Sequence, residues 1–295
     1  MPPPGYPERM TTPDPSLHGQ VALVTGATNG IGKVIARDLA ARGARVYIVG
    51  RDADKTARVA RDLQQATGGD VRTILGDLSV QADVRRVARE YRAAEPRLHI
   101  LVNNAGAFYR ARQETRDGIE MTFALNHLAY FLLTQELLPV LTATPGARIV
   151  NTSSMAHTMT RLRWHDPEFK LGYRGWSAYA QSKLANVLFT RELARRLRGT
   201  DVTVNAFHPG LVRSGFAHNN QGLTSALWGL LRPFSVTEEQ GARTAVYLAT
   251  SADVAGLSGL YFTNEHVAPV SAEALDDAAA ERLWRLSETY VQPVH

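Results

Sequence analysis

The 295-residue sequence contains no cysteine, and this absence removes several classes of function. A disulfide scaffold, a thiolate zinc site, an iron–sulfur cluster and a cysteine nucleophile all require that residue. The sequence also lacks the Gly-x-Ser-x-Gly turn of serine hydrolases and the lysine-containing phosphate loop of NTPases. We therefore expect neither a serine hydrolase nor an NTPase.

Lysine is scarce, because only four of the 33 basic residues are lysines, and the net charge is +5. The arginines are scattered at helical spacing, which is typical of solvated helix faces rather than of a nucleic-acid interface. The histidines lack the spacing of metal ligands. We therefore expect no nucleic-acid partner and no metal site.

Long hydrophobic runs are also missing. A membrane-spanning helix needs about 20 apolar residues, and a signal peptide needs a shorter apolar stretch near the start. The proline-rich beginning of the chain has neither. We expect a soluble, cytoplasmic protein with a disordered arm at 1–16, followed by one domain at 17–295.

Short apolar runs alternate with amphipathic stretches from Val21 onward. The apolar runs predict seven strands, at 21–25, 45–49, 71–75, 100–103, 148–152, 203–208 and 261–262. The amphipathic stretches predict helices at 31–42, 52–66, 80–93, 120–141 (broken near Pro139), 178–198, 237–250 and 272–289. Alternation of this kind indicates a single doubly wound α/β domain, with a mainly parallel sheet flanked by helices.

A glycine-rich turn follows the first expected strand. Glycines there let the backbone approach a pyrophosphate, and the next helix directs its N–H groups at the phosphates. A glycine-rich connection without a ligand is the alternative, and it is less consistent with this position. The candidate cofactor residues of the turn are Gly26, Thr28, Asn29, Gly30, Ile31 and Gly32.

The end of the second expected strand bears on the choice of cofactor. An acidic residue there would hold the ribose hydroxyl of NAD, but position 50 is glycine and Arg51 follows. A guanidinium suits the 2′-phosphate of NADP, and Lys33 offers a second charge. NADP(H) is thus favoured over NAD(H), although both cations can be surface groups and Asp52 can serve a ribose. Asp77 and Leu78, after the third strand, lie where an adenine would bind.

Three further signals occur in order along the chain: an Asn-Asn-Ala-Gly stretch after the fourth strand, a Ser-Ser pair after the fifth, and Tyr179 with Lys183 in the next helix. Residues four apart share one helix face. A lysine ammonium beside a phenol lowers the pKa of the tyrosine, so that tyrosine can act as an acid and base near neutrality. Each signal alone is common, but the ordered set is not.

With these motifs the sequence resembles the short-chain dehydrogenase/reductase family, over roughly residues 19–262. The resemblance implies a Rossmann fold and a catalytic set of Ser154, Tyr179, Lys183 and Asn126. Tyr179 would exchange the proton, Ser154 would polarise the carbonyl oxygen, and Lys183 would hold the nicotinamide ribose and depress the pKa of Tyr179. Asn126 would hold a water that links Lys183 to solvent.

The resemblance also assigns cofactor contacts beyond the glycine-rich turn. One group would support the adenine–ribose side, and a second would flank the nicotinamide. The implied residues are Asn104, Ala105 and Gly106 for the first group, and Pro209, Gly210, Val212 and Ser214 for the second. Family members often form homodimers or homotetramers through helices that correspond to 120–141 and 178–198.

A closer resemblance is to the retinol-dehydrogenase-like branch, on the stretches 123–128, 182–190 and 208–210. Its members convert retinoids, aldehydes and related lipophilic carbonyls, mostly with NADP. Aromatic residues before Tyr179 and apolar residues at 223–234 would wall the substrate cleft, or else belong to the core; a membrane contact at 223–234 is a third reading. They are Trp164, His165, Phe169, Tyr173 and Trp176 in the first segment, and Leu223, Leu227, Leu230 and Leu231 in the second.

The leading hypothesis is therefore an NADP-dependent carbonyl reductase or alcohol dehydrogenase with a lipophilic substrate. One alternative is a ketoreductase that acts on a polycyclic secondary metabolite. Another, of a different class, is an NADP(H)-binding sensor without catalysis. The complete set of proton-transfer residues favours an enzyme, because a binding protein does not need it.

Overall fold

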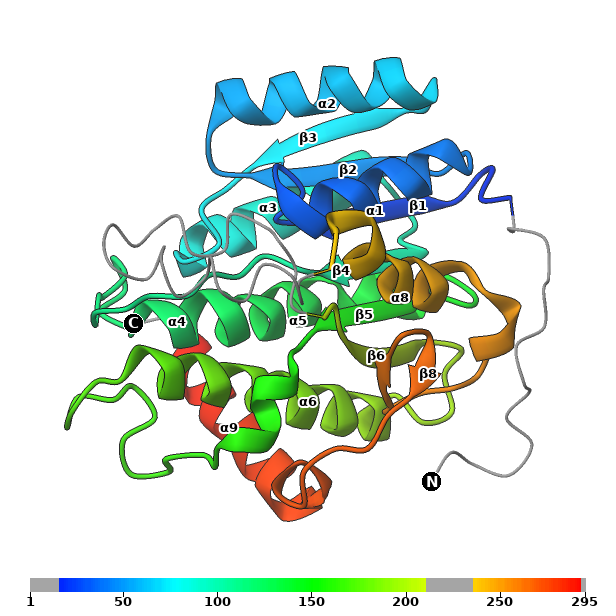
Figure 1. The fold of residues 1–295 in the computed structure, drawn as a ribbon. Coiled ribbons are helices and arrows are strands. Elements are labelled where there is room, and N and C mark those ends of the chain that lie inside the picture. Colours follow the sequence, from blue (N-terminus) through cyan, green and yellow to red (C-terminus); the bar gives the residue numbers. More distant parts are fainter. Residues whose placement is uncertain (1–15, 211–235, 293–295) are drawn as a thin grey trace.

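A computed structural model describes residues 16–210 and 236–292, and the structural statements below refer to these ranges. The strands form one sheet in the order β3-β2-β1-β4-β5-β6-β7-β8 (Figure 1). All neighbours are parallel except β7 and β8. The strands are β1 Val21–Thr25, β2 Arg45–Gly50, β3 Val71–Leu75, β4 Ile100–Asn103, β5 Arg148–Thr152, β6 Thr203–His208, β7 Tyr261–Thr263 and β8 His266–Val267.

The eighth strand was not expected, and β2 and β7 each extend one residue beyond the expected ends at 49 and 262. The eighth strand pairs with β7 across a two-residue turn at Asn264 and Glu265, both of which have positive φ angles (49° and 67°). Such a turn usually carries Asn-Gly. Because Glu265 stands where glycine is usual, the sequence shows no hairpin signal there.

Helices cover both faces of the sheet (Figure 1). α1, α2 and α8 lie on one face and α3, α5 and α6 on the other, with α9 packed outside α6. The helices are α1 Gly30–Ala41, α2 Ala53–Thr67, α3 Gln81–Ala94, α4 Met121–Phe123, α5 Ala129–Thr142, α6 Gly175–Arg196, α8 Glu238–Thr250 and α9 Asp277–Val291. The expected start of α8 is confirmed, because Thr237 and Gln240 form a reciprocal capping box.

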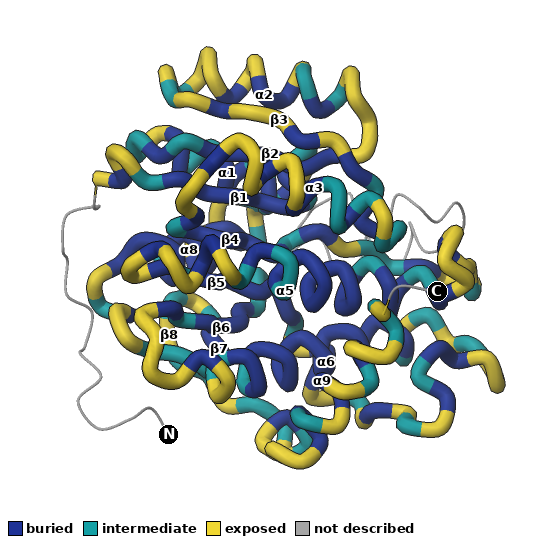
Figure 2. Tube along the Cα trace, turned by 180° about the vertical axis from the view of Figure 1, so that it is seen from behind, coloured by how far each residue is buried: buried dark blue, intermediate teal, exposed yellow. Residues whose placement is uncertain are grey.

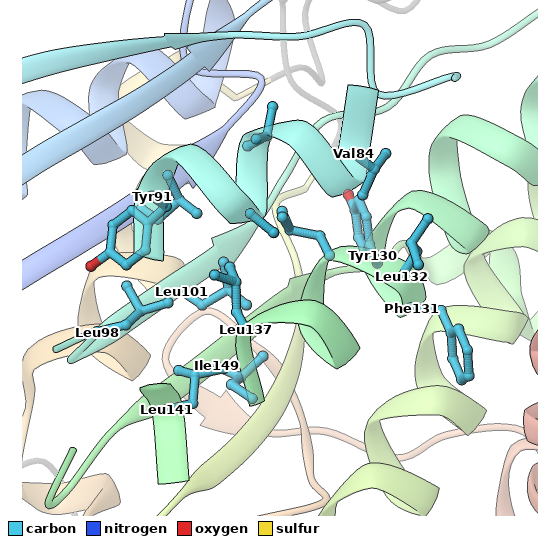
Figure 3. Close-up of a cluster of buried hydrophobic side chains, with 14 of the residues drawn as sticks. Val84, Tyr91, Leu98, Leu101, Tyr130, Phe131, Leu132, Leu137, Leu141 and Ile149 are labelled. Carbon is cyan, nitrogen blue, oxygen red and sulfur yellow. The ribbon is translucent and has the colours of Figure 1, made fainter. Parts of the chain in front are cut away.

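Two apolar clusters, one on each face, fill the space between sheet and helices. The cluster under α3 and α5 includes Tyr91, Leu101 and Leu137, all of them inaccessible to solvent (Figure 3). Seen from behind, the central strands are buried and α2 is exposed on its outer side (Figure 2). This two-sided burial explains the continuous apolar runs of β1 and β4.

The long helix expected at 120–141 contains a π turn. α4 leads into the π-helical segment η1, Ala124–Leu128, and then into α5 without a gap. The break expected near Pro139 is wrong, because α5 continues through Pro139 to Thr142. The proline stands in the last turn of the helix, where a single missing N–H leaves the preceding turns intact.

The C-terminal helix α9 covers part of the surface that α5 and α6 would otherwise expose. Trp284 packs edge-on against Phe131 of α5 and parallel to Phe189 of α6, with ring centroids 4.9 and 6.0 Å apart. The Arg196 guanidinium lies 4.2 Å from the Trp284 ring centroid. The predicted oligomer through α5 and α6 stays a prediction, and part of its expected interface is occupied by the same chain.

Candidate active site

The glycine-rich turn between β1 and α1 packs directly against the end of β4. A Cβ atom added at Gly26 would lie 2.7 Å from the Ala105 Cα, and one at Gly32 would lie 2.4 Å from the Asn104 Nδ2. Neither position therefore has room for a side chain. Gly26 also has a φ of 65°, which glycine adopts without strain.

Thr25, the last residue of β1, ties the two segments together. Its hydroxyl accepts hydrogen bonds from the backbone N–H groups of Asn104 (2.8 Å) and Ala105 (3.0 Å). The Asn104 side chain donates to the Thr25 carbonyl at 3.0 Å. Thr25 was not among the predicted site residues, although it directly precedes the glycine motif.

The amino end of α1 is open to a ligand. The helix begins at Gly30, and its N-cap residue Asn29 makes no side-chain capping bond. No acidic residue occupies the first turn. Uncapped N–H groups and the positive end of the helix dipole suit a phosphate, so Ile31 and its neighbours fit a dinucleotide by this criterion.

The end of β2 explains why position 50 is glycine. A Cβ atom there would lie 2.2 Å from the Thr56 Oγ1 and 2.6 Å from the Thr28 Cγ2, so no acidic side chain fits. Asp52 caps α2 by accepting from the Lys55 N–H at 2.8 Å. The Asp52 carboxylate, which the sequence analysis considered as a partner for the cofactor ribose, is therefore already engaged in capping.

The two cations near this strand end differ. Arg51 is exposed and forms no ion pair with residues of the described ranges. The Lys33 Nζ lies 3.7 Å from the Asp62 carboxylate, with both side chains well exposed. Arg51 is therefore the freer cation for a phosphate group.

Of the two residues expected at the adenine, Asp77 has one carboxylate oxygen engaged and Leu78 is buried. Asp77 accepts from the Ser79 backbone N–H (3.0 Å) and hydroxyl (2.7 Å). Leu78 is buried in the core cluster under α3. Any contact from Leu78 to a cofactor would have to use its backbone.

Ser154 is the second residue after β5 and the N-cap of the short 3-10 segment η2, Met155–Met159. Its hydroxyl oxygen accepts from the Ala156 N–H at 3.2 Å, so the hydroxyl hydrogen stays available to donate. The Ser154 carbonyl accepts from the His157 Nδ1 at 2.7 Å. Ser154 lies near enough to Tyr179 of α6 for its side chain to lower the pKa of that tyrosine.

Tyr179 and Lys183 lie one turn apart on α6, as their spacing predicts. The Lys183 Nζ is 5.6 Å from the Tyr179 ring centroid and donates to the Thr152 carbonyl at 3.2 Å. Both side chains are buried. A Cβ atom at Gly106 would lie 3.6 Å from the Lys183 Nζ, which brings the Asn-Asn-Ala-Gly stretch to the same place.

The electrostatics of this pair differ from the sequence-based expectation. Burial raises the pKa of Tyr179 to about 12, and the Ser154 hydrogen bond opposes this shift only in part. Burial lowers the pKa of Lys183 to about 7. The expected depression of the Tyr179 pKa by a lysine cation is therefore wrong for this structure, because burial disfavours the charged forms of both groups.

Asn126 lies within the π turn, and its side chain is fully engaged. Its Oδ1 accepts from the Ala107 N–H (2.9 Å), while its Nδ2 donates to the Ala107 carbonyl (3.0 Å) and to the Ser182 hydroxyl (3.1 Å). The Asn126 carbonyl accepts from the side chain of Asn186 at 2.8 Å. Asn126 therefore joins the loop after β4 to α6.

The segment after β6 is described only at its start. Gly210 has a φ of 81°, and a Cβ atom there would lie 2.9 Å from the Val236 side chain. Pro209 and Gly210 are both partly exposed. Val212, Ser214 and the apolar segment 223–234 lie outside the described residues, as does the arm at 1–15.

The aromatic residues before Tyr179 divide into two groups. Phe169 is buried, and the Tyr173 hydroxyl donates to the Tyr109 carbonyl at 3.0 Å, so both belong to the packing of this segment. Trp176 is 53% exposed and lies 5.8 Å from the Tyr179 ring. Phe108, from the loop after β4, meets Tyr179 edge-on at 6.2 Å.

Comparison with known proteins agrees with this arrangement. The short chain dehydrogenase family profile matches residues 20–222, which is more than half of the chain. The chain belongs to the short-chain dehydrogenase family. It is accordingly an oxidoreductase that acts on alcohol or carbonyl groups.

Named relatives of this short-chain dehydrogenase include human retinol dehydrogenase 11, which is 43% identical over 92% of this chain and 85% of the relative. Mouse retinol dehydrogenase 12 is 44% identical over 94% and 87%. The predicted likeness to the retinol-dehydrogenase-like branch is thus confirmed.

Solved structures show the same fold. An uncharacterized protein from Mycobacterium paratuberculosis superposes with a TM-score of 0.76 at 34% identity, over 95% of this chain and 96% of that one. The complex of Pseudomonas aeruginosa RhlG with NADP has a TM-score of 0.69 at 34% identity, over 84% and 95%.

Two absences are established for the described residues of this dehydrogenase. Within 16–210 and 236–292, no helix has the length and apolar character to cross a membrane. The same ranges contain no group of three or more metal-binding side chains.

Proposed function

We propose that this dehydrogenase is an NADP(H)-dependent enzyme that interconverts a lipophilic aldehyde or ketone and its alcohol, with Tyr179 as the acid and base. The observation that carries the proposal is the convergence of the partly buried Ser154 with the buried Tyr179 and Lys183 beside the end of β5. Three polar side chains with so few charged partners are typical of a reaction centre.

The proton chemistry follows from the two shifted groups. Because the pKa of Tyr179 is raised to about 12, its phenol is protonated at neutral pH and can donate to a carbonyl oxygen during reduction. The Ser154 hydroxyl oxygen accepts from the Ala156 N–H, and its hydrogen would be donated to the same carbonyl oxygen when a substrate is bound. In the oxidation of an alcohol, Tyr179 takes the proton back. The bound nicotinamide supplies or accepts the hydride.

The choice of NADP(H) rests on the end of β2. An acidic residue at position 50 is excluded by packing, Asp52 caps α2, and Arg51 is exposed without an ion pair to the described residues. A guanidinium of this kind suits a 2′-phosphate. The NADP complex of the related RhlG supports this assignment.

The lipophilic substrate class is supported by the neighbours of Tyr179. The rings of Phe108 and Trp176 flank the phenol, and Trp176 is exposed enough to meet a ligand. Apolar walls with a few polar groups are usual for small-molecule sites. The names of the retinol dehydrogenase relatives point to the same class. The cytoplasmic location stays a prediction.

The test is oxidation of NADPH, followed by its absorbance, with retinal, medium-chain aldehydes and a polycyclic aromatic ketone as substrates and NADH in parallel. We expect turnover with NADPH and at least one aldehyde. The variant Arg51→Ala should lose about 10- to 100-fold in its preference for NADPH over NADH, because a hydrogen bond to a charged group contributes about 1.5–3 kcal/mol. Arg58→Ala, which removes an exposed charge from α2, should keep the preference.

The other outcomes separate the alternatives. Turnover of only the polycyclic ketone would favour a ketoreductase of secondary metabolites. Tight NADPH binding with no turnover of any carbonyl would favour a sensor. A preference for NADH would contradict the role given to Arg51.

A further inference from the structure

A side chain outside the predicted set, Asn186, holds the backbone groups around Lys183. Its Nδ2 donates to the Thr152 carbonyl (3.1 Å), which is also the acceptor for the Lys183 Nζ. The same Nδ2 donates to the Asn126 carbonyl at 2.8 Å. This carbonyl lies within the π turn, where the altered helical spacing makes room for a side-chain partner. Asn186 thus joins β5, η1 and α6 at one buried atom.

Asn186 is itself held from the far side of the helices. Its Oδ1 lies 3.3 Å from the His127 Nδ1, and the His127 Nε2 lies 2.8 Å from the Ser287 hydroxyl on α9. None of the three side chains is accessible to solvent. This buried chain therefore runs from the C-terminal helix to the carbonyl that Lys183 uses.

The direction of each bond follows from the acceptors present. Two carbonyl partners require the Asn186 nitrogen to face them, so its oxygen faces His127. His127 must then carry its hydrogen on Nδ1 and accept at Nε2 from the Ser287 hydroxyl. Burial lowers the pKa of His127 to about 4, which keeps the ring neutral as this arrangement requires. The Leu283 carbonyl, 2.9 Å from the Ser287 oxygen, competes for the same hydroxyl hydrogen.

We propose that Asn186 is a positioning residue for Lys183, and that His127 and Ser287 lock its amide in the orientation that this requires. The amide fixes the Thr152 and Asn126 carbonyls, and the first of these carbonyls is the acceptor of the Lys183 amine. The effect of Asn186 on turnover rests on the proposed function, whereas the effect of Asn186 on the ionisation of Lys183 is independent of that function.

The surroundings of Lys183 make this effect measurable. The titratable groups that face its amine are the phenols of Tyr179 on α6 and Tyr130 on α5, with ring centroids 5.6 and 6.0 Å from the Nζ. Burial is the one cause of its lowered pKa, and no carboxylate of the described ranges forms an ion pair with it. A change in hydration next to the amine should therefore appear directly in its titration.

The test is a pH titration of the chain labelled with ¹⁵N-lysine, followed by NMR of the side-chain amines. Only four lysine signals are expected, and Lys183→Arg identifies the relevant one. In Asn186→Ala, water enters beside two unpaired carbonyls and stabilises the ammonium, so the Lys183 midpoint should rise by about one pH unit or more. Ser287→Ala, which leaves Asn186 in place but frees its orientation, should raise the midpoint by less.

Thr190→Val is the matched control. Thr190 is equally buried on the same helix, and its hydroxyl bonds the Asn186 carbonyl (2.8 Å) and accepts from Asn151 (3.0 Å), so the substitution removes buried hydrogen bonds without touching the amide. Its Lys183 midpoint should equal that of the wild type. An unchanged midpoint in Asn186→Ala, or an equal shift in Thr190→Val, would overturn the proposal. An unchanged midpoint in Ser287→Ala would overturn the part assigned to α9.

Turnover separates this proposal from the proposed function. If the wild type reduces one of the test carbonyls, Asn186→Ala should lower kcat about tenfold or more, since misplacement of reacting groups is costly. If the wild type reduces none, the proposed function fails, and the titration still decides the role of Asn186.

Discussion

The two ends of the sheet differ in whether their buried polar side chains form ion pairs. At the amino ends of β2 and β3, the buried Glu95 accepts from Arg45 and from the Tyr47 hydroxyl, both at 2.9 Å. Arg45 and Arg72 also share the Asp70 carboxylate. At the carboxyl end of β5, Tyr179 and Lys183 are buried, and burial is the largest cause of the pKa shift of each.

The consequences for ionisation differ accordingly. Burial would raise the pKa of Asp70, but the hydrogen bonds from Arg72 and Arg45 outweigh it, and the net shift is downward. The same contacts raise the pKa of Arg45. These groups stay charged across the neutral range, whereas burial brings the pKa of Lys183 down to about 7. Ion pairs keep the groups at the amino ends charged, whereas burial brings the lysine at the carboxyl end to a pKa at which it can exchange a proton near neutrality.

The largest effect should come from removing the same hydroxyl at the two ends. Tyr179→Phe should lower kcat about 10²–10⁴-fold with NADPH binding retained, because it removes the acid and base. Tyr47→Phe, which removes a hydroxyl bonded to Glu95, should retain turnover and lose about 1–3 kcal/mol of unfolding free energy. Steady-state kinetics and urea unfolding of both variants measure this. A similar loss of activity in Tyr179→Phe and Tyr47→Phe would contradict the different roles assigned to the two ends of the sheet.

A second prediction concerns stability and pH. The folded pKa of Lys183 is about 7, below its ordinary value of 10.5, so the unfolded chain binds more protons between these values. The lysine should therefore make the unfolding free energy rise with pH from about 7 to about 10.5, by about 1 kcal/mol per pH unit, and its stabilising contribution is lost as the pH falls toward 7.

Urea unfolding at pH 7, 8, 9 and 10 measures this slope. Lys183→Met should flatten it, whereas Lys33→Met, at a half-exposed lysine on α1, should leave it as in the wild type. A wild-type slope in Lys183→Met would mean that the amine is hydrated in the folded state.

The smallest effect is expected for Glu95→Gln at the amino end. The amide keeps the shape of the carboxylate but loses its charge, and Arg45 and Arg72 are exposed enough for water to replace part of the interaction. We expect a loss of about 1–2 kcal/mol in unfolding free energy and unchanged kcat. Thermal unfolding and a steady-state kinetic assay of Glu95→Gln measure these two quantities. A fall in kcat would show that the two ends are coupled through the sheet.

Local sequence patterns predicted most of the elements. The expected strands 21–25, 71–75, 100–103, 148–152 and 203–208 coincide with β1, β3, β4, β5 and β6. Apolar β-branched runs and capping residues act over a few positions, so one sequence suffices to detect them. The hairpin of β8 and the π turn at Asn126 were missed, because each depends on a partner distant in sequence or on an unusual turn residue.

For the candidate site, too, the sequence predicted the features that depend on local spacing. The sequence placed Tyr179 and Lys183 on one face of a helix and aligned Ser154 with the end of a strand, and the structure brings the three together. Thr25 and Asn186 escaped notice, although Asn186 lies three residues after Lys183 and thus on the same face. Their partners come from β4, β5 and η1, and no spacing along the chain reveals those contacts.

What the sequence by itself determined is the order of strands and helices, the glycine turn, and the residue types that meet at the carboxyl ends of the strands. Only the tertiary structure decided the ionisation of Lys183 and the packing that requires glycine at position 50. It also decided the chain of hydrogen bonds that runs from Ser287 on α9 through His127 toward Lys183. The physical reason is the range of the forces involved. Hydrogen bonding within an element and hydrophobic periodicity are local, whereas burial and the partners of a polar group are properties of the whole packed chain.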